Sequence, residues 1–163
     1  MGSRRRSRFG FDAKDIDLNV SAVLFADDHI ADVVYHQQVS SRDGSVRDLG
    51  DSTTGEGKGD NEVITIDLTR IPAQVTTTTI VLLVTSYTGQ TFDQIDNAFC
   101  RAVDTVSATE IAHHDLSAIH LHTGLVVGKV SRAQTAWQFQ PIGEAIGAQH
   151  PVEAIPQIAR FSG

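Results

Sequence analysis

The run of residues 51–62 combines acidic side chains with glycine in a pattern suited to a hard cation. Asp51, Glu56, Asp60 and Glu62 supply carboxylates, and three glycines alternate through the segment. Calcium takes six to eight oxygen ligands from carboxylates, hydroxyls and backbone carbonyls, and glycine lets the backbone turn sharply enough to aim several carbonyls at one centre. The segment therefore predicts a calcium-binding loop, although a solvated acidic loop without metal has the same composition.

Two aspartates earlier in the sequence could supply further ligands to this site. In residues 15–25 the even positions from Ile16 to Leu24 are apolar and the odd positions from Asp15 to Ser21 are polar, which is typical of a strand with one buried face. Asp15 and Asp17 then point the same way, which is costly unless they are solvated or share a cation. The predicted metal ligands, from both segments, are Asp15, Asp17, Asp51, Thr54, Gly55, Glu56, Gly57, Asp60 and Glu62.

The acidic loop is not an EF-hand. Glu62 stands twelfth when counted from Asp51, as the last ligand of an EF-hand loop does. Glu56, however, occupies the position that an EF-hand requires to be glycine, and no helical pattern flanks the loop.

The elements that must position these residues are short strands. Alternating or β-branched apolar runs predict about eight of them, with no long amphipathic helix, and Asp27-Asp28 and Asp43-Gly44 predict turns. The sequence therefore predicts an all-β, antiparallel two-sheet β-sandwich with short helical turns and a short C-terminal helix. The expected strands cover residues 15–25, 30–36, 62–68, 76–87, 99–103, 110–116, 124–130 and 137–142, the segment 40–61 is expected to be loop, 91–97 a helical turn and 151–159 the helix.

Composition limits the class of protein. The 163 residues carry a net charge of −7 and suit one domain, here 9–163, after a flexible basic tail at 1–8. This acidity argues against specific nucleic-acid binding. The single cysteine, Cys100, excludes an internal disulfide and reads as a small buried hydrophobe. With no membrane-spanning run and no signal peptide, we expect a cytoplasmic protein.

The histidines offer a weaker alternative metal site. His120 and His122 would share one face of a strand, and His-x-His pairs bind zinc. No cysteine cluster or third ligand accompanies them, and His113 and His114, being adjacent, would point to opposite faces. Ordinary surface or core histidines are the favoured interpretation. No nucleophile elbow or phosphate loop is present, so we expect no enzyme.

Six ordered segments between residues 9 and 145 resemble the TerD family of bacterial tellurite-resistance and general stress proteins. The segment at 43–51 is similar to the family's DGSV…GDN run, and that at 54–62 is similar to TGEGEGDDE. The other four segments are Phe11-Asp12 with 15–22, 92–103, 110–116 (similar to ELARYDL) and 137–143 (similar to WKFKAVG).

The resemblance implies a two-sheet β-sandwich that holds calcium in an acidic loop region and acts in stress resistance, without established catalytic residues. Two positions depart from the family pattern: Lys58 replaces an acid and Asn61 replaces an aspartate. Both changes reduce the negative charge of the loop. We therefore expect one firm calcium site, and the presence of a second calcium site stays open. The expected function is a non-catalytic binding or scaffold module with protein partners in a stress-resistance complex and peripheral membrane association, its oligomeric state being open. The alternative is a metal-independent interaction module with a degenerate acidic loop.

Overall fold

The computed structural model describes residues 8–14, 18–27, 29–51, 61–71, 79–86, 91–92, 99–116, 122–133 and 136–162. This part of the chain forms strands and short helices. They are β1 (Arg8–Lys14), β2 (Leu18–Ala26), β3 (His29–Val34), β4 (Val46–Asp51), β5 (Asn61–Asp67), η1 (Leu68–Arg70), β6 (Thr79–Ser86), β7 (Phe99–Asp104), β8 (Thr109–Asp115), β9 (Gly124–Ala133), β10 (Ala136–Ile146), α1 (Pro151–Ile158) and η4 (Ala159–Phe161).

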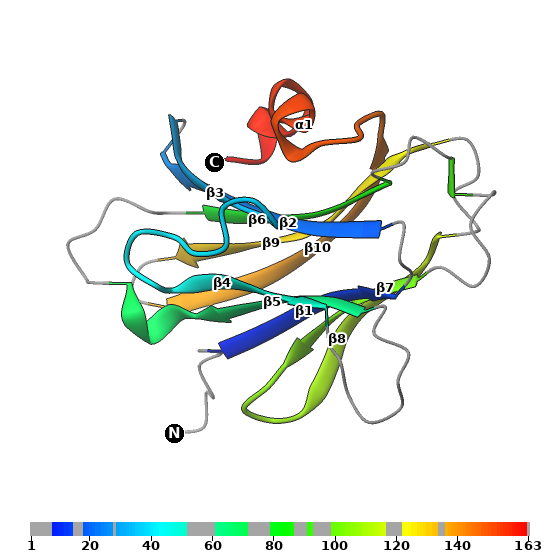
Figure 1. The fold of residues 1–163 in the computed structure, drawn as a ribbon. Coiled ribbons are helices and arrows are strands. Elements are labelled where there is room, and N and C mark those ends of the chain that lie inside the picture. The colour runs from blue at the N-terminus through cyan, green and yellow to red at the C-terminus, as the bar shows by residue number, and fades with distance from the viewer. Residues whose placement is uncertain are drawn as a thin grey trace.

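The strands form two five-stranded sheets that face each other, as Figure 1 shows. The first sheet has the order β4-β5-β1-β7-β8, and the second has the order β10-β9-β6-β2-β3. Every neighbouring pair of strands is antiparallel. The predicted two-sheet antiparallel sandwich is confirmed.

Alternating apolar side chains fill the space between the sheets. In β1, Phe9, Phe11 and Ala13 are buried in this core. In β6 every residue is buried, because the β-branched run contributes side chains to both faces of its sheet. The strand predicted within 76–87 is confirmed, and it is buried on both faces.

The C-terminal segment adds a third layer over the second sheet. Figure 1 shows α1 lying on the outer side of that sheet, where Ala154 and Ile158 pack with side chains of β2 and β6. The Thr79 hydroxyl donates to the Ser162 carbonyl oxygen at 3.0 Å, and an Arg160–Glu144 ion pair joins η4 to β10. The predicted C-terminal helix is confirmed.

This layer corrects the prediction that residues 15–25 form a strand with one buried face. The even positions from Leu18 onward do face the core between the sheets. Val23 and Phe25, on the other face of β2, are also buried because α1 covers them. The single-face prediction was wrong: the alternation holds only as far as Ser21, and the apolar Val23 and Phe25 at the next odd positions are buried under α1.

The segment 40–61, expected to be loop, contains β4. Val46 and Asp48 of this strand are buried, and a short bridge between Ser40 and Arg47 extends the pairing at the sheet edge. The two predicted turns are confirmed by positive φ angles at Asp27 (58°) and Gly44 (75°). Among the residues with a described structure, no helix has the length and apolarity needed to cross a membrane.

Candidate metal centre

Strand register brings the two predicted ligand segments to one end of the first sheet. Asp51, at the end of β4, is the Cα partner of Glu62 in β5, and Glu62 is the partner of Ala13 in β1. Asn61 is likewise the partner of Lys14, the last residue of β1. The connection 52–60 therefore ends, at the start of β5, beside the end of β1, where the connection 15–17 begins, and these two strand ends are about 5 Å apart across the sheet.

The structure places only part of the predicted ligand set. Asp51 and Glu62 lie in described strands, where their backbones face each other across β4 and β5. The remaining predicted ligands, namely Asp15, Asp17, Thr54, Gly55, Glu56, Gly57 and Asp60, lie outside the described residues. Within the described ranges, no group of three or more His, Cys, Asp or Glu side chains is arranged to hold a metal ion. The site stays a prediction.

Asp12, although it lies near this end of β1, has a structural partner. It faces Arg101 across β1 and β7, and the Arg101 Nε donates to its Oδ1 at 3.1 Å. The Asp12 side chain is largely buried whereas that of Arg101 is half exposed. This ion pair joins β7 to β1, the strand whose end leads into the candidate centre, so Asp12 is engaged in strand pairing and is not part of the predicted ligand set.

The adjacent histidines of β8 point to opposite faces, as predicted. His113 lies on the outer face, stacked on Phe99 at 5.2 Å between ring centroids and 3.5 Å from Glu110. His114 turns inward and reaches β10, where its Cε1 lies 3.1 Å from the position that a Cβ on Gly143 would occupy. The ring fits there because Gly143 has no side chain. His122 is described but exposed, and His120 lies outside the described residues.

Cys100 is fully buried in β7, as its apolar surroundings predicted. Burial is the main cause that raises the pKa of its thiol to about 12, and the negative charge of Asp12 adds to the effect. A thiol in this environment stays protonated and is a poor nucleophile or metal ligand.

His114 is expected to make stability depend on pH. Burial, and secondarily the neighbouring His113, lower the pKa of its imidazole below the usual histidine value of 6.5. Between the lowered pKa and about 6.5 the unfolded chain binds more protons than the folded one, so the free energy of unfolding falls as pH decreases through that window. His114→Gln should therefore gain stability relative to the natural sequence as the pH is lowered from about 7.5 to 5.

Melting temperatures over this pH range measure the effect. His122→Gln is the control, because it removes an exposed histidine of the same chain. Parallel pH profiles for His114→Gln and His122→Gln would contradict the assignment of the effect to the buried ring.

The molecule is thus a two-sheet β-sandwich with two acidic connections leaving neighbouring strands at one end. Comparison with known proteins gives the family. Residues 2–155 match the TerD domain model, and the chain belongs to the TerD family.

Two curated relatives illustrate the match. Over 131 residues the chain is 37% identical to tellurium resistance protein TerZ of Serratia marcescens, covering 80% of this chain and 66% of TerZ. Over 115 residues it is 30% identical to general stress protein 16U of Bacillus subtilis, covering 69% of this chain and 60% of that protein. The chain therefore spans somewhat less than two thirds of the length of these relatives.

A solved structure has the same fold. The crystal structure of a protein of unknown function superposes with a TM-score of 0.79 at 24% identity, covering 93% of this chain and 96% of the other. At this identity the likeness concerns the fold alone.

Proposed function

We propose that this TerD-family chain is a calcium-binding, non-catalytic module that acts in the cytoplasm as part of a stress-resistance assembly. The observation that carries the proposal is the register that brings Asp51, Glu62 and the end of β1 to one end of the first sheet. The names of TerZ and general stress protein 16U support the link to tellurium and stress resistance.

The chemistry of the donor set fits calcium. Asp51 and Glu62 begin and end a connection that also contains Glu56 and Asp60, and the residues after β1 include Asp15 and Asp17. These are oxygen donors without a sulfur or imidazole among them, which favours a hard cation over zinc. When bound, the ion would supply positive charge that removes the repulsion among these carboxylates and ties two connections together.

Calcium is expected to bind the natural sequence and to stabilise it. A ligand that binds only the folded state raises the free energy of unfolding by about 2.7 kcal/mol at a concentration of 100 Kd. Titration calorimetry and melting curves, each with and without a chelator, measure both effects. Asp60→Ala should weaken calcium affinity by about tenfold or more, because fewer charged ligands remain.

Two further variants sharpen this test. Glu110→Ala removes one negative charge from β8, the edge strand opposite to β4 in the first sheet. It should leave calcium affinity unchanged. Lys58→Glu should tighten binding, because it restores a negative charge where the loop carries a positive one. Absence of any calcium-dependent heat or melting shift in the natural protein would instead favour a metal-independent interaction module.

A further inference from the structure

Three arginine side chains lie around Gly44 and Asp67, at the end of the first sheet opposite to the candidate metal centre. Arg8 begins β1, Arg47 lies in β4 and Arg70 ends η1, so three separate segments contribute. The side chains of Arg8 and Arg70 are more than half exposed, and Arg47 is exposed as well. Since β1 runs from Arg8 to Lys14, roughly 20 Å of strand separates this group from the candidate metal centre.

Two of the guanidinium groups converge above the backbone of Gly44. The Arg47 Nη2 lies 3.5 Å, and the Arg70 Nη1 3.6 Å, from the point that a Cβ on Gly44 would occupy. The two nitrogens are therefore at most about 7 Å apart, a span that one tetrahedral oxyanion bridges with hydrogen bonds of ordinary length. Gly44 has a φ of +75°, so the turn itself favours glycine and leaves the space beneath the two groups without a side chain.

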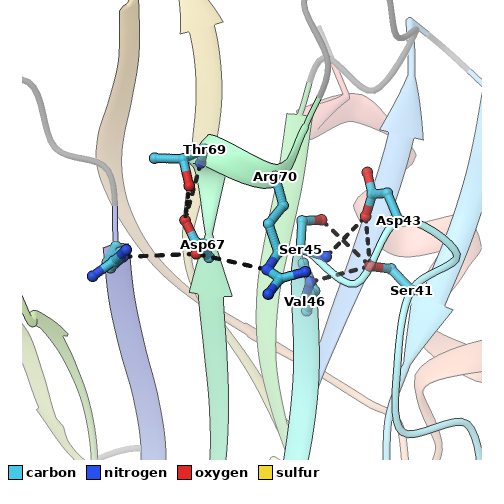
Figure 2. Close-up of polar contacts among 8 residues, drawn as sticks. Ser41, Asp43, Ser45, Val46, Asp67, Thr69 and Arg70 are labelled. Carbon is cyan, nitrogen blue, oxygen red and sulfur yellow. Dashed lines mark hydrogen bonds and ion pairs between the residues drawn. The ribbon is translucent and has the colours of Figure 1, made fainter.

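The acidic groups nearby are already hydrogen-bonded within their own turns, as Figure 2 shows. Asp43 accepts hydrogen bonds from the Ser41 hydroxyl and the Ser45 N–H, both at 2.9 Å. Asp67 accepts from the N–H and hydroxyl of Thr69 through its Oδ1. These bonds help to hold the pKa of both carboxyls below the usual aspartate value, so both stay ionised.

Asp67 does not satisfy the hydrogen-bonding capacity of the neighbouring arginine side chains. Its Oδ2 lies 3.7 Å from the Arg8 Nε and 3.8 Å from the Arg70 Nε, too far for a hydrogen bond to either. Exposed ion pairs of this kind contribute little to folding. Arg8, Arg47 and Arg70 together exceed Asp43 and Asp67 by one positive charge, in a chain whose net charge is −7. The group is therefore a local cationic site on an acidic protein.

We propose that Arg47 and Arg70 bind a phosphate group in its dianionic form, seated over Gly44, while Arg8, on the other side of Asp67, adds positive charge nearby. A carboxylate has two oxygens, which a single guanidinium can satisfy in a forked geometry. A phosphate monoester or free phosphate carries a larger charge and presents oxygens in several directions, so it can accept hydrogen bonds from two or three guanidinium groups at once. The phosphate group could come from free phosphate or from a lipid headgroup.

The first test uses inorganic phosphate as the probe. Amide chemical shifts are followed at about pH 7.5, where phosphate is mostly dianionic, with sodium chloride adjusted to keep ionic strength constant. Saturable shifts are expected at Gly44, Ser45 and Thr69. The double variant Arg47→Gln/Arg70→Gln should bind at least about tenfold more weakly, because it removes both converging donors.

Arg132→Gln is the control, because Arg132 packs on the Trp137 ring in the other sheet. It removes one positive charge, as each of the two substitutions in the double variant does. It should bind phosphate like the natural protein. Circular dichroism melts establish that every variant is folded, which the exposure of the replaced arginines favours.

The second test distinguishes the sources of the phosphate group. Vesicles of phosphatidylcholine with and without phosphatidic acid are sedimented with the protein, alongside a variant in which Arg4, Arg5 and Arg6 are replaced by glutamine. Binding of either probe that is lost in Arg47→Gln/Arg70→Gln and kept in Arg132→Gln supports the site and identifies its source. No binding of either probe, equal loss in the control, or vesicle binding that depends only on Arg4–Arg6 would overturn it.

Discussion

Phe11→Ala is expected to lower the free energy of unfolding by about 3–5 kcal/mol, the usual cost of truncating a buried phenylalanine. Phe11 is fully buried in β1, the central strand of the first sheet, where its Cα partners are Ile64 and Ala102. Strands paired on both sides of β1 limit how far the surroundings can close the cavity that the truncation would leave. Domains of this kind have only about 5–15 kcal/mol of stability in total.

Urea denaturation measures this loss. Phe99→Ala is the matched control, because Phe99 lies on the neighbouring strand β7 but is only partly buried, against His113 on the outer face. The control should lose less than half as much stability. Equal losses would contradict the placement of Phe11 at the centre of the sandwich.

The same substitution also bears on the candidate metal centre. Phe11 is three residues before the end of β1, where the connection containing Asp15 and Asp17 begins. If that end of β1 becomes less ordered, only a fraction of molecules has the binding-competent arrangement, and apparent calcium affinity falls by that fraction. Phe99→Ala should leave calcium affinity closer to that of the natural protein.

Local sequence patterns predicted most of the strands because burial in a sandwich imposes a period of two. In β5 the buried Ile64 and Ile66 alternate with partly exposed residues, and in β6 the unbroken apolar run indicates burial on both faces. Where only one or two inward positions exist, that signal is too short. The strand β4 was missed for this reason: over Val46–Leu49, the part of β4 whose burial is described, Val46 is the one buried apolar residue and Asp48 the other buried side chain.

The candidate sites differ in how far sequence could predict them. The acidic segment 51–62 is contiguous, so composition alone pointed to it. Its relation to β1 depends on register, which neither segment encodes by itself. The arginine group was not predicted at all, since Arg8, Arg47 and Arg70 are scattered along the chain. They come near one another only after β1 and β4 pair with the two sides of β5, which leads into η1.

Ile158→Ala is expected to cost about 2–4 kcal/mol, because Ile158 is the fully buried apolar anchor near the end of α1. It packs into the cluster formed by Val23, Phe25 and their neighbours on the outer face of the second sheet. The matched control is Ile155→Ala, in the same helix at a half-buried position, which should cost about 1 kcal/mol or less. Urea denaturation of the two variants gives the comparison.

Amide hydrogen exchange shows how that cost is distributed. α1 has eight residues and contains Pro156, which cannot donate the usual helical hydrogen bond. A helix of this length is not stable in water without tertiary packing. In Ile158→Ala, exchange should therefore accelerate first in α1, while the amides of β1 and β5, which lie in the other sheet, remain protected. Uniform acceleration in both sheets, or equal costs for Ile155→Ala and Ile158→Ala, would contradict the description of α1 as a separate third layer held by its buried face.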